Sequence, residues 1–228
     1  MWHTRLRVPA GAALALTFAL AASAQSGVHP VSGRRFAPVM GVGGAPWLDR
    51  SEREMEEAPE KALDALEITK GSTVADVGAG SGYFTVRLSA RVGDAGRVFA
   101  TDVQPDMLDL LRARLTERRL TNVTLVHGAV DDPRLPSSSI DLVLLVDVYH
   151  EFSAPQAMLQ RIHAALKPDG RLVLLEYRKE DPSIPIRIEH KMSVAEAKAE
   201  IEAERFHLVH VDERLPRQHI LIFARREP

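Results

Sequence analysis

A glycine-rich turn that directly follows a short β-branched run constrains the fold of this chain more than any other feature. The run Thr73–Val77 leads into Gly78, Gly80 and Gly82, and glycine lets a backbone turn sharply and approach a ligand closely. Twenty residues beyond Gly82, the next β-branched run reaches Asp102, where a carboxylate can accept hydrogen bonds from both hydroxyls of a ribose. The turn and the acid together predict an α/β domain that binds a nucleotide-like cofactor.

The rest of the chain alternates short apolar runs, typical of strands, with segments whose apolar residues recur at helical spacing. The expected strands are Thr73–Val77, Arg97–Thr101, Val123–Val126, Ile140–Val146, Arg171–Leu175, Phe206–Val211 and His219–Ala224. The expected helices are Ser51–Leu66, Ser81–Arg91, one that opens at Pro105, one from Ser153 to Leu166, and Val194–Glu204. This alternation predicts a doubly wound, mostly parallel seven-stranded sheet, and the close spacing of the last two strands predicts an antiparallel hairpin at its C-terminal edge.

Local signals mark where some of these elements begin. Ser153 with Gln156, and Ser193 with Glu196, have the spacing of a capping box, in which a side chain satisfies the first free amides of a helix. The residues at 168–170 are Pro-Asp-Gly, which predicts a turn before the strand at Arg171–Leu175. We therefore expect side-chain caps at both helix starts and a strand that begins at Arg171, directly after the turn.

The composition and the glycine spacing exclude several classes of site. The chain has no cysteine, so it has no disulfide and no thiolate metal site, and its net charge of −2 gives no general attraction to nucleic acid. Tyr83 stands where a dinucleotide-binding turn has its third glycine, and no Gly-Lys-Ser/Thr follows, so a dinucleotide oxidoreductase and a phosphate loop are both disfavoured. A turn that serves only the packing of another doubly wound domain stays an alternative.

The N-terminal residues have the composition of a secretory signal peptide. Arg5 and Arg7 precede the apolar run Val8–Ala21, and residues 22–24 are Ala-Ser-Ala, a small-residue cleavage site. We expect a signal peptide over 1–24, an extended Gly- and Pro-containing lead-in or lid over 25–50, and one domain over 51–228. The expected location is periplasmic or secreted, whereas initiation at Met40 would make the protein cytoplasmic. In the lead-in, Phe36 and Trp47 are candidates for closing over a ligand.

Five motifs, in matching order and spacing, resemble those of class I S-adenosylmethionine-dependent methyltransferases: Val74–Tyr83, Asp102, Val126–Ala129, Ile140–His150 and Leu166–Leu172. The resemblance extends from about Pro59 to Arg225 and implies S-adenosyl-L-methionine as the cofactor. It implies cofactor contacts at Asp76, Gly78, Gly80, Gly82, Tyr83, Asp102, Val103, Gly128, Ala129 and Asp147. In one departure, Ala129 stands where many relatives have an acid, so the backbone of Ala129, or Asp131, would have to contact the adenine.

The candidate catalytic residues are Tyr149, His150 and Glu151, because ligands of open α/β sheets lie beyond the carboxyl ends of the strands. His150 could take a proton from the acceptor, Tyr149 could orient the acceptor, and Glu151 could hold His150 or bind a cation. A purely structural pair of His150 with Glu151 is the alternative. Segments 176–177 and 190–191 could form the far wall of the acceptor pocket, although the lysine at 191 is expected to be solvated.

We expect no metal site, since His207, His210 and His219 lack an H-E-x-x-H arrangement. The favoured function is methyl transfer to a small-molecule acceptor, with no nucleic-acid partner and no membrane association once the signal is removed. The alternative is an exported, non-catalytic binding protein that keeps the fold, because S-adenosylmethionine is made in the cytoplasm. The pattern specifies no oligomeric state.

Overall fold

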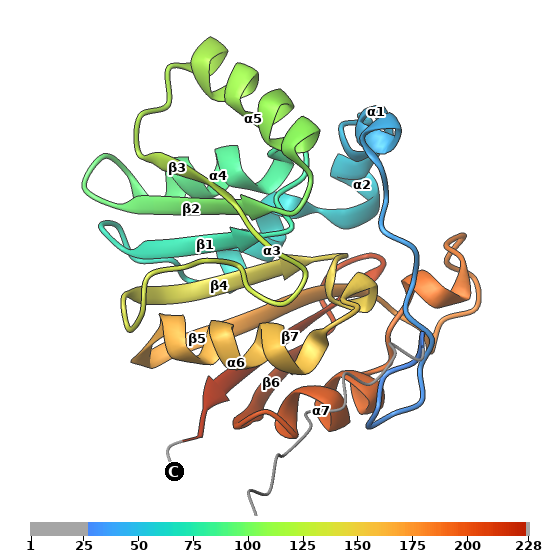
Figure 1. Ribbon diagram of the computed structural model, residues 1–228. Coiled ribbons are helices and arrows are strands. Elements are labelled where there is room, and N and C mark those ends of the chain that lie inside the picture. The colour runs from blue at the N-terminus through green and yellow to red at the C-terminus, as the bar shows by residue number, and fades with distance from the viewer. Residues whose placement is uncertain (1–26, 227–228) are drawn as a thin grey trace, which may run out of the picture.

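The strands pair into a single mixed sheet in the computed structural model, which describes residues 27–226 (Figure 1). The strands are β1 (Thr73–Val77), β2 (Arg97–Asp102), β3 (Val123–His127), β4 (Ile140–Val146), β5 (Leu166–Tyr177), β6 (Phe206–Asp212) and β7 (Gln218–Arg225). Their order is β3-β2-β1-β4-β5-β7-β6. The first five are parallel, and β7 runs antiparallel to both β5 and β6, which confirms the predicted fold class.

Helices cover both faces of the sheet because its central strands are apolar on both sides. Val74 and Leu144 pack against α3 (Pro59–Ala65) and α4 (Tyr83–Val92). Ala75 and Leu145 point to the opposite face and pack with α6 (Pro155–Ala165) and α7 (Val194–Glu202). The helix α5 (Pro105–Arg118) lies against β2 and β3. Each fully buried leucine or valine contributes roughly 1.5–3 kcal/mol, so these two layers hold the carboxyl ends of the strands in place.

The helix predicted over Ser51–Leu66 is interrupted. The structure has α2 (Arg53–Glu57) and α3, separated by Ala58 in the left-handed conformation at φ = 49°. Pro59 explains the break, because its ring disfavours the right-handed helical conformation in the preceding residue. Proline is tolerated in the first turn of α3, where its missing amide hydrogen is not needed.

Two local predictions about helix starts have opposite outcomes. The capping box at Ser193 and Glu196 is present in α7, which confirms that prediction. The cap at Ser153 is wrong, since Ala154 occupies the N-cap of α6 and no side chain caps it. Pro155 at the first helical position lacks one of the amide hydrogens that have no partner within the helix.

The predicted turn at residues 168–170 lies inside β5, which begins at Leu166 and not at Arg171. The pairing of β4 with β5 shifts register there, because Ile140 pairs with Leu166 while Leu142 pairs with Arg171. A side chain at Gly170 would lie 2.8 Å from the carbonyl oxygen of Ile140. The segment is therefore an irregularity within the strand, and glycine permits the close approach of the two backbones.

The lead-in contains short helices that its glycines and prolines did not predict: η1 (Val42–Gly44) and α1 (Ala45–Leu48). Pro46 stands in the first turn of α1, where its fixed φ suits a helix start. Figure 1 shows the blue lead-in running beside the carboxyl ends of the parallel strands. The predicted signal peptide, residues 1–24, lies outside the described residues. Within residues 27–226, no helix combines the length and apolarity needed to cross a bilayer.

Candidate active site

A cavity of about 440 Å³ lies at the carboxyl ends of the parallel strands, between the glycine-rich turn, the loops after β2 and β4, and the lead-in. Most of the predicted site residues line it: Gly78, Gly80, Asp102, Val103, Gly128, Ala129, Asp147, His150 and Glu151. The remaining predicted residues, Asp76, Gly82, Tyr83 and Tyr149, are absent from its wall. The structure therefore brings the cofactor and acceptor candidates from four strand ends into one space.

The glycine-rich turn has the conformation that the sequence predicts. Gly78 and Gly82 have φ values of 77° and 89°, a region that residues with side chains rarely adopt. A Cβ atom on Gly78 would lie 2.4 Å from Val148 Cγ2, and one on Gly82 would lie 2.1 Å from Leu111 Cδ1. Gly82 thus serves the packing of the turn against α5, whereas Gly78 keeps the cavity open beside the loop after β4.

Asp102 joins the turn to the end of β2. Its Oδ2 accepts a hydrogen bond from the Gly80 amide at 2.9 Å, and its Oδ1 accepts one from the Gln104 amide at 2.9 Å. The carboxyl group is buried, and this burial raises its pKa. Each carboxylate oxygen has two lone pairs, so both oxygens can accept a further bond from a ligand hydroxyl in the cavity.

Three predicted residues have partners away from the cavity. Asp76 is fully buried below the turn, where its Oδ2 accepts a hydrogen bond from the Thr85 hydroxyl at 2.6 Å, and burial raises its pKa to about 6. The Tyr83 hydroxyl donates to Glu54 at 2.7 Å on an exposed part of the surface. The Tyr149 hydroxyl lies 3.4 Å from His29 Nε2 in the core. Asp76 thus supports the turn from beneath, and Tyr149 anchors the lead-in.

Asp147 follows β4 in the left-handed conformation, with φ = 49°. Its Oδ2 accepts a hydrogen bond from Gln218 Nε2 at 2.8 Å, while its buried Oδ1 has no hydrogen-bond partner within the described part of the chain. Burial, with the nearby carboxylates of Glu57 and Glu176, raises the pKa of Asp147 well above its usual value. An unpartnered buried oxygen at the cavity wall is suited to a ligand that donates a hydrogen bond or carries positive charge.

The adenine contact expected at Ala129 is limited by the local backbone. The Ala129 amide donates to the carbonyl oxygen of Asp132 at 2.7 Å, and its carbonyl oxygen accepts from the Asp132 amide at 3.3 Å. Both backbone groups are thus already paired in the turn after β3. Ala129 lines the cavity, so the backbone contact to the adenine that was expected there stays a prediction.

His150 is held by Glu176, a pairing that no motif in the sequence indicates. His150 Nδ1 lies 2.6 Å from Glu176 Oε2, and the Tyr149 amide donates to Glu176 Oε1 at 3.1 Å. The alternative of a His150–Glu151 pair is wrong, since the bond of Glu151 Oε1 is to the Met40 amide at 3.3 Å. Glu176 is fully buried at the end of β5, and Val146 pairs with Leu175, so the ends of β4 and β5 lie side by side.

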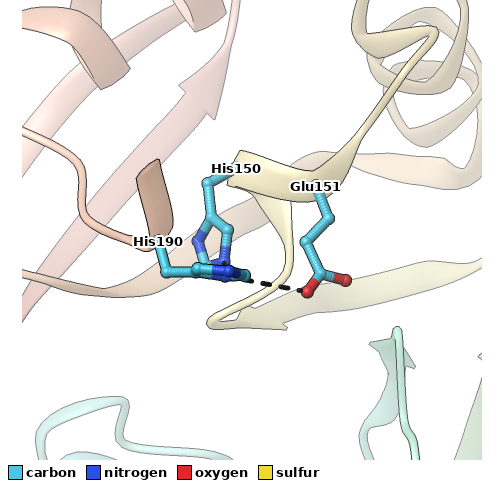
Figure 2. Close-up of side chains that lie close together, drawn as sticks. All are labelled: His150, Glu151 and His190. Carbon is cyan, nitrogen blue, oxygen red and sulfur yellow. Dashed lines mark hydrogen bonds and ion pairs between the residues drawn. The ribbon is translucent and has the colours of Figure 1, made fainter. Parts of the chain in front are cut away.

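The other nitrogen of His150 faces His190, from η3 (Ile188–His190), as Figure 2 shows. His150 Nε2 lies 3.2 Å from His190 Nδ1, and His190 Nε2 lies 2.8 Å from Arg187 Nη2. Because arginine can only donate, the proton of His190 resides on Nδ1 and is donated to His150, whose own proton on Nδ1 points to Glu176. Burial and the nearby His150 lower the pKa of His190, which keeps the ring neutral.

Among the further cavity residues, Tyr177 and Trp47 were candidates for the pocket wall and for closing over a ligand, whereas Arg53 had no sequence signal for a site. Arg53 and Tyr177 line the wall and both bond to the buried Glu57, at 2.6 Å and 2.7 Å. Trp47 also lines the cavity, whereas Phe36 does not. The prediction of a solvated Lys191 is wrong: it is 3% exposed, and its Nζ donates to the carbonyl oxygen of Ile184 at 2.7 Å.

Comparisons with known proteins agree with this geometry. Residues 74–170 match a family described as a methyltransferase domain. A crystal structure of a SAM-dependent methyltransferase from Aquifex aeolicus aligns with a TM-score of 0.76 and 26% identity, over 82% of this chain and 98% of that one. The matched family and the aligned structure are both described as methyltransferases. The domain match and the Aquifex structure also support S-adenosylmethionine as the cofactor of this methyltransferase domain.

Two curated relatives of the methyltransferase domain add detail. The demethylmenaquinone methyltransferase of a Geobacillus species is 28% identical over 117 residues, which are 51% of this chain and 50% of that protein. The ubiquinone/menaquinone biosynthesis C-methyltransferase UbiE of an Enterobacter species is 30% identical over 118 residues, 51% of this chain and 47% of that protein. The chain spans about half the length of the curated relatives it matches.

Proposed function

We propose that this protein transfers a methyl group from S-adenosylmethionine to a small-molecule acceptor bound in the cavity at the carboxyl ends of the strands. The observation that carries the proposal is the shared wall: Asp102 and Asp147 at the ends of β2 and β4 face the same space as His150. Names of the relatives that refer to quinone biosynthesis support a small acceptor. The apolar side chains of Val39, Met40 and Phe152 line the same cavity and suit an aromatic or aliphatic molecule.

The residues at the glycine-rich turn fit the cofactor. Asp102 has free lone pairs for two ribose hydroxyls, and a side chain on Gly78 would fill the space beside Val148. The unpartnered Asp147 Oδ1 suits the ammonium group of the methionine portion. When bound, S-adenosylmethionine supplies an electrophilic methyl group on its sulfonium sulfur.

The protein's contribution to the reaction is mainly placement. Holding two reactants in line can supply about 7–11 kcal/mol of the barrier, so no metal or covalent intermediate is required by the chemistry. His150 is the group oriented to take a proton from an acceptor hydroxyl or amine, because Glu176 fixes the proton on Nδ1 and leaves the lone pair on Nε2. For this role the side chain of His190 has to turn away from Nε2, and its side chain is 15% exposed toward the cavity.

Calorimetry on the purified full chain tests the cofactor site before any acceptor is known. S-adenosylmethionine and S-adenosylhomocysteine should bind with a 1:1 stoichiometry, whereas NAD should not bind. An acceptor panel of small phenols, amines and thiols then tests transfer. Absence of binding in a folded protein would contradict the proposal, and tight binding without turnover on any acceptor would favour a non-catalytic binding protein.

We also propose that the protein is exported to the periplasm or secreted. The support is the sequence alone, namely two arginines, an apolar run and a small-residue cleavage site within residues 1–24. Fractionation of cells that express the full chain, followed by N-terminal sequencing, should give a product that begins at Gln25 outside the cytoplasm. A cytoplasmic product that keeps residues 1–24 would contradict export.

A further inference from the structure

We propose that His150, Glu151 and His190 form a binding site for a divalent transition-metal ion of the zinc or iron type at the acceptor end of the cavity. Figure 2 shows the three side chains converging, two from η2 (Tyr149–Glu151) and one from η3. Each offers one ligand atom, and these atoms all lie within 4.8 Å of one another. Two imidazoles and a carboxylate are a donor set that these ions prefer.

The distances fit a single ion with little movement. Metal–ligand bonds of about 2.0–2.2 Å place two ligands of a tetrahedral ion roughly 3.3–3.6 Å apart. His150 Nε2 and His190 Nδ1 are 3.2 Å apart, and His190 Nδ1 and Glu151 Oε1 are 4.0 Å apart. The two pairs that include Glu151 must close by rotation of the Glu151 side chain, which is not held by any ion pair to an arginine or lysine among the described residues. The three atoms thus reach a common ligand position after this one rotation.

The contacts behind the cluster resemble those behind metal ligands. A histidine ligand usually donates its other ring N–H to a carboxylate, which fixes the tautomer and makes the free nitrogen a better ligand. Glu176 provides this contact to His150 Nδ1 at 2.6 Å, and both side chains are almost fully buried. The pair therefore presents His150 Nε2 in the orientation that a metal ion needs.

Binding requires one change, which the structure permits. His190 Nδ1 carries a proton in the hydrogen-bonded arrangement, so metal binding requires the other neutral tautomer, in which the proton is on Nε2 and Nδ1 has the free lone pair. The contact of Arg187 with His190 Nε2 would then be lost. The Arg187 side chain is 68% exposed, so it can move into solvent without leaving a buried charge.

The ion would also define the chemistry of the acceptor. Three protein ligands leave at least one coordination position open, and all three residues line the cavity, so this position faces the acceptor. A metal ion lowers the pKa of a bound hydroxyl. The site would therefore take an acceptor with a phenol, enol or similar oxygen, whose proton passes to solvent. With the ion bound, His150 serves as a ligand and does not take the proton, so its role as proton acceptor belongs to the ion-free protein. The role of the ion rests on the proposed methyl transfer, whereas metal binding itself does not.

Metal binding can be measured without an acceptor or cofactor. The full chain, purified without a histidine tag and stripped with a chelator, is titrated with Co²⁺ alone while visible absorption is recorded, and with Zn²⁺ by calorimetry. We expect about one equivalent bound, with the d–d bands of a low-coordinate Co²⁺ site. His190→Gln and Glu151→Gln should each lower the affinity at least tenfold, and Glu176→Gln should lower it by about 10–100-fold.

His210→Gln is the matched control, because His210 lies on β6 with a side chain that is 58% exposed and is not part of the cluster. Its metal affinity should equal that of the unaltered protein. Absence of a stoichiometric ion, or an equal loss of affinity in His210→Gln and His190→Gln, would overturn the metal site. Calorimetry with S-adenosylhomocysteine on the same samples separates the two proposals: intact cofactor binding without metal binding refutes only the metal site, and the reverse refutes only the cofactor site.

Discussion

Replacement of Asp102 by asparagine should weaken cofactor binding far more than it weakens the fold. The carboxylate accepts one bond from the Gly80 amide and one from the Gln104 amide. Asparagine keeps one oxygen, so one of these two amides loses its acceptor and faces an NH₂ group, at a cost of about 1–3 kcal/mol in unfolding free energy. A domain with ordinary stability of about 5–15 kcal/mol remains folded after this loss.

The loss in cofactor affinity is a separate effect from the loss in unfolding free energy. A charge-assisted hydrogen bond contributes about 1.5–3 kcal/mol, so the loss of one bond to the ribose should weaken binding by about 10–150-fold. Calorimetry with S-adenosylhomocysteine measures the affinity, and urea unfolding without ligand measures the stability. Asp109→Asn is the control, because Asp109 lies on the exposed side of α5 with a side chain that is 74% exposed. Unchanged affinity in a folded Asp102→Asn protein would refute the placement of the ribose at this carboxylate.

Three further predictions concern stability and are measured by urea unfolding. The folded-state pKa of Asp76, about 6, exceeds its usual 3.8, so the stabilising effect of its proton is present below pH about 4 and is lost as the pH rises through 6. The Asp76→Asn protein should therefore have a higher unfolding free energy than the original at pH 8, by up to about 3 kcal/mol. A difference that does not shrink toward pH 4 would contradict this. Arg34→Met should lower the unfolding free energy by about 3–5 kcal/mol, because it leaves Glu200 buried without its bidentate partner. Arg35→Met is the control and should change the unfolding free energy little, because the neighbouring Arg35 is exposed. Ser193→Ala should cost about 1 kcal/mol by removing the cap of α7, while Ser153→Ala, which caps nothing, should be nearly neutral.

The parts of the fold that were predictable from the sequence are those set by local pattern. Apolar, β-branched runs identified every strand, because strands buried on both faces need continuous apolar residues. The errors occurred where one residue overrides a pattern. Pro59 divides a segment of helical spacing, and Gly170 lets β5 begin four residues before the end of an apparent turn. Both outcomes depend on backbone sterics that residue periodicity does not contain.

The candidate site also has residues that were predictable from the sequence and a partner that was not. The positions of Gly78, Gly80 and Asp102 follow from a turn and the neighbouring strand, so spacing along the chain was sufficient to bring them together. The partner of His150 could not be found in this way, because Glu176 lies 26 residues away and reaches His150 only through the pairing of β4 with β5. The parallel order of these strands was predictable, so the signal that could have found the pair was an acid at the end of the strand expected beside β4.

The lead-in is the segment whose role depends most on tertiary contacts. Its Ala37 amide donates to the carbonyl oxygen of His150 at 3.0 Å, and its Met40 amide donates to Glu151 Oε1 at 3.3 Å. The Met40 carbonyl oxygen in turn accepts from Gln104 Nε2 at 2.9 Å, two residues after Asp102. One extended segment thus connects the loop that carries His150 and Glu151 to the loop that follows Asp102, the proposed ribose-binding acid. Backbone groups make both ends of the first contact and the lead-in end of the other two, so the side-chain composition of the lead-in does not indicate them. A change in the lead-in should therefore alter cofactor and acceptor binding together.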